Sequence, residues 1–315
     1  MNAANRSARI RMYFLLAATV ALCVFCVVSR SMMPNDPDFA DLAHVKLAPC
    51  AEYPFGTDWL GRCVYSRILA GAPLSVFSAL AIVALTVVLG CAVGMICGYF
   101  GGAVDAVLMR FVDVFMAFPG MILALAVAGM LGSGLQNVVI ALAATGWPQY
   151  ARLSRSYVLS LRQENFVLAA RLNGQTSAGI LFRHILPNAM RLVIVTPSLN
   201  VGGTILALSG LSFLGLSASS VDWGSAISDG RGLMGQASWL VLYPGAAICL
   251  TSILFNLLGD SVRDVLDPTQ NTNNYFGDNN EKRKGFDTCA ATAGSRISER
   301  LRRCARRLKR ADQRR

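Results

Sequence analysis

The sequence has few charged residues and almost no histidine. Of its 315 residues only 15% are charged, against 54% hydrophobic, and the mean hydropathy is +0.48. A soluble domain of this length needs more charge to cover its surface, so the composition indicates a membrane protein. The two histidines, His44 and His184, belong to no set of residues that predicts catalysis or metal binding. We expect His184, which lies in a cationic segment, to have a surface role.

The sequence motifs of several enzyme classes are also missing. There is no G-x-x-x-x-G-K-[ST] phosphate-binding loop, no H-E-x-x-H and no G-x-S-x-G, so the chain does not bind ATP by the first of these devices. No carboxylate lies between Asp113 and Arg152 or between Arg191 and Asp222. Ion-coupled carriers place such groups at mid-membrane depth. A self-contained channel or secondary carrier is therefore the weaker alternative, and a membrane scaffold or sensor is a third.

The nine cysteines show no zinc-finger spacing. Cys23 and Cys26 form a C-x-x-C pair inside an apolar run, where we expect cysteine to behave as a small hydrophobic residue. Cys50 and Cys63 fall on the predicted outer side of the membrane, and a disulfide between them is left open. The sequence predicts no metal site and no bound cofactor.

Long apolar runs predict about six transmembrane helices. The first is uncleaved, in preference to a signal peptide, and a polar outer loop follows it, over residues 31 to 71. We expect Gly90, Gly94 and Gly98 to allow close helix contact, and we place Trp223 and Trp239 in an interfacial belt. The predicted spans are Met12–Ser29, Leu74–Tyr99, two helices that start before Asp113, end at Ala151 and are joined at Gly132-Ser133-Gly134, then Leu192–Val221 and Leu233–Gly259.

The charges are distributed unevenly about these spans. Basic residues dominate from Arg152 to Arg191, whereas acids outnumber them in the predicted outer loop. This asymmetry predicts that both termini are cytoplasmic. The net charge of +11 resides largely in the C-terminal tail and beside the spans, which favours contact with membrane lipid and not with nucleic acid. The expected domains are residues 1–71, a core of 72–268 and a basic, disordered tail of 269–315.

The segment from Gln163 to Asn188 is polar and cationic, and it separates two hydrophobic blocks. We expect a helix over Phe166 to Leu172, a break at Gly174, and a second helix that ends at Pro187. Two short helices at a membrane surface suit docking against a soluble partner better than they suit chemistry.

This segment resembles the cytoplasmic coupling motif of bacterial ABC-importer permeases. Ala169-Ala170, Gly174 and Ile185-Leu186-Pro187 match that motif, while Leu168 replaces its glutamate. Further stretches resemble the dipeptide/oligopeptide/nickel permease family, in its second-permease branch. They are FGTDWLGR (55–62), MRFVDVFMAFPG (109–120), LSFLGLS (211–217), DWG (222–224) and NLLGDSVRDVLDP (256–268). Residues 129–143 and 160–174 are most similar to nickel-transport permeases.

The resemblance implies an all-α, polytopic type I ABC importer permease in the bacterial inner membrane. Such a subunit is not an enzyme. It pairs with a second permease, its partner ATPase subunits bind ATP, and an extracytoplasmic binding protein delivers the substrate. The implied substrate is nickel, free or chelated, with dipeptides or oligopeptides as the alternative, on a path with only weak polar contacts. The implied coupling residues are Phe166, Leu168, Ala169, Ala170, Arg171, Leu172, Gly174, Leu181, Phe182 and Pro187. We expect Phe166, Leu172, Leu181 and Phe182 to be apolar anchors, two of them packed on this subunit's own helices.

Overall fold

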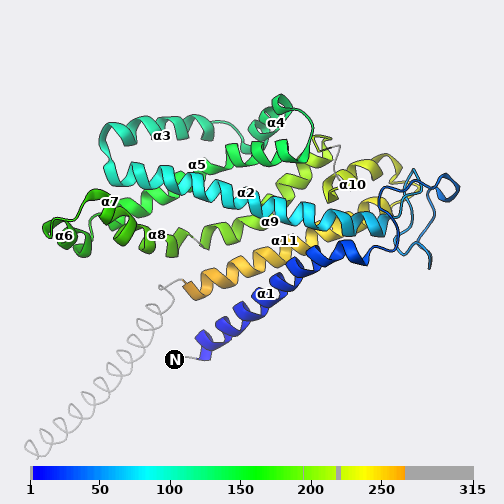
Figure 1. Cartoon of the computed structure of the whole chain (residues 1–315), viewed down its shortest axis with the longest axis horizontal. Helices are drawn as coiled ribbons and strands as arrows, with labels where there is room; N and C mark the ends of the chain where they lie inside the picture. The colour runs from blue at the N-terminus through cyan, green and yellow to red at the C-terminus, as the bar shows by residue number, and fades with distance from the viewer. Residues whose placement is uncertain (1–2, 194, 218–220, 267–315) are drawn as a thin grey trace, which may run out of the picture. The chain divides into compact units, whose positions relative to one another are not determined.

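Helices make up nearly all of the structure (Figure 1). The computed structural model describes residues 3–193, 195–217 and 221–266. Within these ranges there is no β-strand beyond one isolated bridge, between Thr57 and Cys63. The all-α fold class is therefore confirmed. The predicted tail of 269–315 lies outside the described residues.

Five long helices form the body of the molecule, and short helices connect them. The long helices are α1 (Ala3–Val28), α2 (Val64–Phe100), α5 (Leu135–Leu161), α9 (Val195–Phe213) and α11 (Trp239–Leu266). The short ones are α3 (Gly102–Met116), α4 (Gly120–Leu131), α6 (Asn165–Leu172), α7 (Ser177–Ile180), α8 (Leu186–Val193) and α10 (Trp223–Gly230). The main packing pairs are α2 with α5, α9 with α11, and α1 with α11.

Three of the described helices are long and apolar enough to cross a membrane: Ala8–Met32, Val64–Phe100 and Trp239–Val265. The pair α3 and α4 is a fourth candidate, bent by 89°. The other expected spans correspond to α5 and α9, of 27 and 19 residues, which carry polar side chains among their apolar ones. The chain is a polytopic membrane protein.

The third expected span is not one straight helix. Its two halves, α3 and α4, are separated at Ala117–Pro119, and Pro119 is the residue before α4. Proline has no backbone N–H and disfavours helical backbone in the residue before it, so the helix stops here. The turn at Gly132-Ser133-Gly134 is confirmed, since Gly132 and Gly134 have φ of +89° and +144° between α4 and α5.

Several predicted boundaries are wrong because a charge was read as the edge of a helix. The helix α2 begins at Val64 and not at Leu74, so the outer loop ends at Cys63 and not near Gly71. Arg67, inside its first turns, is buried and paired with Asp58 and Asp229. Pairing the charge makes it compatible with the start of a membrane helix. Likewise α11 starts at Trp239 and not at Leu233.

The predicted interfacial position of Trp223 is also wrong. Its side chain is only 3% exposed, and its Nε1 donates to the Ile68 carbonyl at 2.9 Å. The residue therefore fastens the start of α10 to α2 inside the core. The disulfide left open by the sequence is not formed, since Cys50 and Cys63 are both free, one exposed and one buried.

Glycines bring α2 and α5 into close contact. A Cβ atom at Gly90 would lie 2.5 Å from the Trp147 carbonyl oxygen, and one at Gly94 would lie 2.3 Å from the Ala151 carbonyl oxygen. The expected glycine contact is therefore confirmed, and α5 is the helix that it admits. Ion pairs also join α5 to α3: Arg155 donates to Asp105 at 2.5 Å and Arg152 donates to Asp113 at 2.7 Å.

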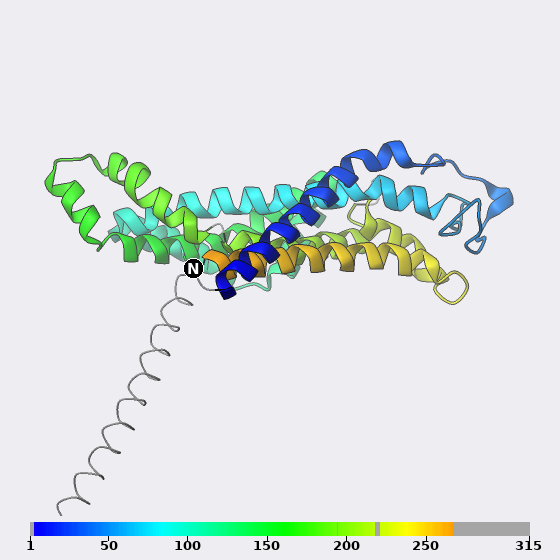
Figure 2. The ribbon, with the colours of Figure 1, turned by 90° about the horizontal axis from the view of Figure 1, so that it is seen from below.

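The two ends of the helical unit differ in character. The short helices α6 and α7 lie at one end, and the loop before α2 lies with α10 at the other (Figures 1 and 2). An ion pair between Arg11 and Asp264 holds the start of α1 beside the end of α11. The N-terminal helix thus begins on the same side as the last described helix ends.

Candidate functional site

The segment 163–188 forms a helix, a turn and a second helix, as expected. The turn is at Gly174, whose φ is +73°, a conformation that glycine adopts without steric cost. Its N–H donates to the Arg171 carbonyl at 3.0 Å, and that of Gln175 donates to the Ala170 carbonyl at 3.2 Å. These bonds close the end of α6, and the Thr176 side chain then caps α7 by accepting from Gly179.

The second helix does not end at Pro187, so that prediction is wrong. After α7 the chain forms a π-helical turn over Leu181–Ile185 and continues as α8 to Val193. Proline normally breaks a helix because it lacks the N–H and crowds the preceding carbonyl. The wider π turn comes directly before this proline, and it lets the helix run past Pro187.

One face of the segment is buried against α2 and α5. The side chains of Val167, Ala170, Ile180 and Ile185 form a core cluster there with Tyr99, Val158 and Leu181. All are at most 8% exposed. Sequence reasoning missed Val167, Ile180 and Ile185, although their apolar spacing was the available signal. This cluster fixes the position of the segment on the helical body.

The other face is apolar and exposed. Phe166 is 38% exposed, Leu168 46%, Phe182 64% and Leu172 89%. Of the four expected anchors, Leu181 is buried in the core cluster, and Phe166 is the least exposed of the other three. Leu181 and Phe182 are neighbours in the π turn, and only the first of them is buried.

Positive charge accompanies these apolar side chains. Arg171 and Arg183 are exposed, and the Arg171 guanidinium lies 5.9 Å from the centre of the Tyr99 ring. His184 Nε2 is 2.9 Å from Gln175 Oε1, which links the turn after α6 to the second arm of the segment. Ala169 and Pro187 are exposed, whereas Ala170 is buried. The exposed face is therefore apolar and cationic.

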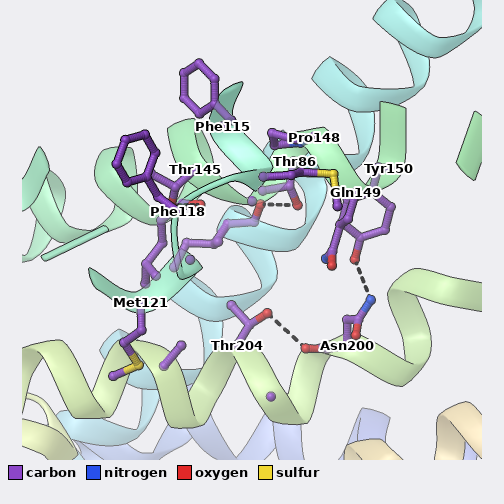
Figure 3. A pocket seen from close by; sticks show the side chains of 17 residues that line it. Thr86, Phe115, Phe118, Met121, Thr145, Pro148, Gln149, Tyr150, Asn200 and Thr204 are labelled. Carbon is purple, nitrogen blue, oxygen red and sulfur yellow. Dashed lines mark hydrogen bonds between the residues drawn. The ribbon is translucent and has the colours of Figure 1, made fainter. Parts of the chain in front are cut away.

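A second feature is a cavity of about 410 Å³ between the helices, which opens to the surface at exposed lining residues such as Gln149 and Gly203 (Figure 3). Its walls come from α2, α5 and α9, and the bend between α3 and α4 closes one side. The polar side chains that line it are Thr86, Thr145, Gln149, Tyr150, Asn200 and Thr204. No Asp, Glu, Lys, Arg or His belongs to its described lining.

Hydrogen bonds order part of this lining. Asn200 Nδ2 donates to the Tyr150 hydroxyl at 3.1 Å, which joins α9 to α5 across the cavity wall (Figure 3). The Thr86 and Thr204 hydroxyls bond to carbonyls of their own helices. Sequence reasoning missed these residues, and its only signal was the presence of Gln149 and Asn200 within otherwise apolar blocks.

A cluster of charges holds the outer loop at the opposite end from α6. Asp58 accepts from Arg62 Nε at 2.7 Å and from Arg67 Nη1 at 3.4 Å. Arg67 also donates to Asp229 of α10 at 3.0 Å. The cluster has a structural role, because its charges pair with one another and hold the outer loop, α2 and α10 together.

His44 is the other titratable group of interest in the outer loop. Its Nδ1 lies 2.6 Å from Asp41 Oδ2, and this hydrogen bond raises the pKa of His44 and lowers that of Asp41. The ring nitrogen is therefore engaged by a carboxylate. No group of three or more His, Cys, Asp or Glu residues with metal-binding geometry occurs within the described ranges.

The sequence was compared with known protein families. Residues 90–271 match the family described as "Binding-protein-dependent transport system inner membrane component". The chain belongs to this family of ABC importer permeases. The matched range contains the segment 163–188 and most of the cavity lining, so both features lie in the part that the family shares.

Individual relatives of the permease differ in their substrates. It is 42% identical over 222 residues to the dipeptide transport system permease protein DppC of Alkalihalophilus pseudofirmus. The match covers 70% of this chain and 73% of the relative. It is 39% identical over 261 residues to the nickel transport system permease protein NikC of Escherichia coli K12, covering 82% and 94%. A glutathione transport system permease protein, GsiD of Pectobacterium atrosepticum, is 39% identical over 243 residues, covering 76% and 81%.

These relatives identify the chain as a dipeptide/oligopeptide/nickel-type permease, a multi-pass protein of the inner membrane. Permeases of this family are transport components and not enzymes. The matching relatives divide among nickel, dipeptide and glutathione systems, so they leave its own substrate open.

Proposed function

We propose that the segment 163–188 couples this permease to a cytoplasmic ATPase. The observation that carries the proposal is the exposure of Phe166, Leu172 and Phe182 on a segment whose opposite face is anchored in the core. Apolar side chains exposed together mark a contact surface, and a short helix with such a face fits a groove in a partner. Leu168, where the family motif has glutamate, adds to the apolar area.

The segment, the N-terminus and the C-terminal tail are on the cytoplasmic side in this proposal. Its basis is the excess of Arg over acidic residues between Arg152 and Arg191. The permease pairs with a second permease, and an extracytoplasmic binding protein delivers the substrate to the pair. Closure of the ATPase subunits moves the segment, and the buried cluster passes that movement to α2 and α5.

The proposed substrate is nickel bound to small organic ligands. Imidazole and thiolate groups suit bare Ni²⁺, whereas the described cavity lining offers hydroxyl, amide and phenol groups. A nickel ion that keeps its chelator needs only weak contacts of this kind. A dipeptide is the second candidate, because the same groups suit peptide and carboxylate atoms and because one relative is a dipeptide permease.

Uptake measurements separate the two substrates. A strain that lacks this chain is complemented with it, and uptake of radiolabelled nickel with a chelator is compared with uptake of a labelled dipeptide. We expect complementation to restore nickel uptake. Restoration of dipeptide uptake alone would replace nickel by peptide as the substrate.

Purification in mild detergent tests the coupling. We expect an ATP-hydrolysing subunit to copurify with the permease. Transport by the reconstituted chain alone, without ATP or partners, would instead identify a self-contained channel or carrier.

A further inference from the structure

The cavity between α2, α5 and α9 has the features of a binding site and not of a packing defect. Its volume, about 410 Å³, lies in the range of small-ligand sites in proteins. Polar groups from three helices converge on it, whereas an unfilled packing defect in a membrane helix bundle is lined by apolar atoms. We propose that this cavity is a station on the transport path that binds a small, hydrogen-bonding ligand of zero net charge. The proposal rests on the transport role proposed above.

Each helix that forms a wall lines the cavity with one of its faces. On α9 the lining residues Asn200, Gly203, Thr204 and Ala207 have the spacing of a single helical face. On α5 the lining residues Leu142, Thr145, Gly146 and Gln149 repeat that spacing. The cavity is thus bounded along about two turns of each helix, and it is not a gap between two side chains.

Gly203 is a glycine of the cavity lining that packing within this chain does not explain. A glycine inside a helix costs backbone entropy and needs a structural reason. Its neighbour Gly202 has one, because a Cβ there would lie 2.3 Å from Asn256 Oδ1. A Cβ at Gly203 would meet no atom within 4 Å. The absent side chain at Gly203 leaves space in the cavity and serves no helix contact among the described residues.

The lining offers hydrogen bonds to a ligand. Asn200 donates through Nδ2 to Tyr150, and no bond from a described residue reaches its Oδ1. Gln149 is exposed beside Tyr150, with its amide on the cavity side (Figure 3). An amide group carries both donors and acceptors. The station can therefore bind a carboxylate, an amine or a peptide group of a ligand.

Because the described lining carries no charge, the cavity favours a ligand whose net charge is zero. A charged solute that leaves water must be compensated by opposite charges or by its own counter-charge. With no Asp, Glu, Lys or Arg in that lining, compensation must come with the ligand. A zwitterionic peptide meets this condition, as does nickel with two singly charged chelating ligands. Hydrated Ni²⁺ does not.

The first test fills the station from Gly203. The full importer, with its second permease, ATPase subunits and binding protein, is made with Gly203→Leu and, as control, Gly245→Leu. Gly245 is in α11, outside the cavity lining, and a Cβ there also meets no atom within 4 Å. We expect Gly203→Leu to lower uptake about tenfold or more, and Gly245→Leu to stay within about twofold of the wild type.

The second test places a charge in the station. Gly203→Asp and Gly203→Asn have similar size and differ in charge. The binding protein is unchanged, so any change in preference between the two variants comes from the permease. We expect Gly203→Asp to raise uptake of a cationic ligand relative to a neutral one severalfold over Gly203→Asn. Two pairs of cationic and neutral ligands are compared: glycyl-lysine with glycyl-glycine, and unchelated Ni²⁺ with its neutral bis-glycinate complex. The use of both pairs also distinguishes a peptide substrate from a metal substrate.

Two results would overturn the station. The first is wild-type uptake by Gly203→Leu when the variant is present in the membrane at wild-type amount. The second is the same charge preference in Gly203→Asp and Gly203→Asn. ATPase copurification, measured on every variant, distinguishes these results from failure of the proposed function. If no ATPase accompanies even the wild type, the coupling proposal fails. If the ATPase accompanies all variants and uptake is unaffected, only the station fails.

Discussion

At the scale of single residues, glycine has three different roles in this permease. Gly94 is required by the approach of α5, because its missing Cβ leaves room for the Ala151 carbonyl oxygen. Gly174 is required by its backbone, with φ of +73° and open space around it. Gly203 is required by neither, and it opens the cavity. The sequence predicted the first two roles, whereas only the structure shows the role of Gly203.

Replacing Gly94 tests the helix contact. Gly94→Ala places a methyl group 2.3 Å from the Ala151 carbonyl oxygen, and overpacking of this kind costs about 1–3 kcal/mol. We expect a lower midpoint of thermal unfolding in detergent. The control is Gly129→Ala in α4, where a Cβ meets no atom within 4 Å. Equal midpoints for the two variants would contradict the close α2–α5 contact.

Replacing Gly174 tests the backbone requirement. A β-branched residue in the left-handed region costs about 1–2 kcal/mol, whereas asparagine adopts this region more readily. We therefore expect Gly174→Val to lower uptake and ATP hydrolysis together, and Gly174→Asn to retain most of both. If valine and asparagine behaved alike, the turn at this residue would not be needed for coupling.

At the scale of elements, the segment 163–188 has two surfaces, one buried and one exposed. Val167, Ile180 and Ile185 attach it to α2 and α5, while Leu172 and Phe182 remain exposed. In the proposed coupling, this attachment passes a displacement of the segment to the helical body. In the proposed coupling, the exposed side chains supply the area on which the ATPase acts. A mutation on each surface should therefore have a distinct phenotype.

The two surfaces are separated by paired substitutions. Ile185→Ala removes fully buried atoms, which costs about 2–5 kcal/mol, so we expect a lower unfolding midpoint. The double variant Leu172→Ser, Phe182→Ser should leave that midpoint unchanged and reduce the amount of copurified ATPase. Normal ATPase recovery with this double variant would show that the exposed face is not the docking surface.

At the scale of the whole molecule, charges hold together segments that are distant in sequence. Arg67 joins the outer loop through Asp58 to α10 through Asp229. The side chains of Arg67 and Asp58 are 8% and 5% exposed, whereas that of Asp229 is 39% exposed. Burial decides how much each contributes, because removing one partner of a buried pair leaves the other uncompensated.

The stability of the outer end tests this argument. Arg67→Met should destabilise the protein by about 3 kcal/mol or more, seen as a lower unfolding midpoint or a lower amount in the membrane. Asp229→Asn should cost about 1 kcal/mol or less, since its carboxylate is partly exposed and solvent screens it. A larger effect of Asp229→Asn than of Arg67→Met would contradict the assignment of Arg67 as the centre of the cluster.

Cysteine labelling tests the orientation of the whole chain. Exposed Cys50 and Cys249 are first replaced by serine, and then Glu52→Cys or Arg171→Cys is introduced. In intact cells with a permeant outer membrane, a membrane-impermeant thiol reagent should label the first variant and not the second. Labelling of the cysteine at position 171 from outside would remove the segment from the reach of any cytoplasmic ATPase.

Local patterns in the sequence were sufficient for the class of protein and for the shape of the segment. The low charge content indicated a membrane protein, and the helix before Gly174 and the break at that residue were predicted at nearly their observed positions. The expected contact through Gly90, Gly94 and Gly98 was also confirmed. These features depend on residues close together in the chain, which is why the sequence alone determined them.

Only the tertiary structure decided which distant residues meet. Arg67 was read as the edge of a loop because its partner Asp229 lies far along the chain, and Trp223 as interfacial because its acceptor, Ile68, belongs to another helix. The cavity is the clearest case, since Tyr150 and Asn200 come from different helices. Burial and pairing depend on how helices pack together, and no local pattern records that packing.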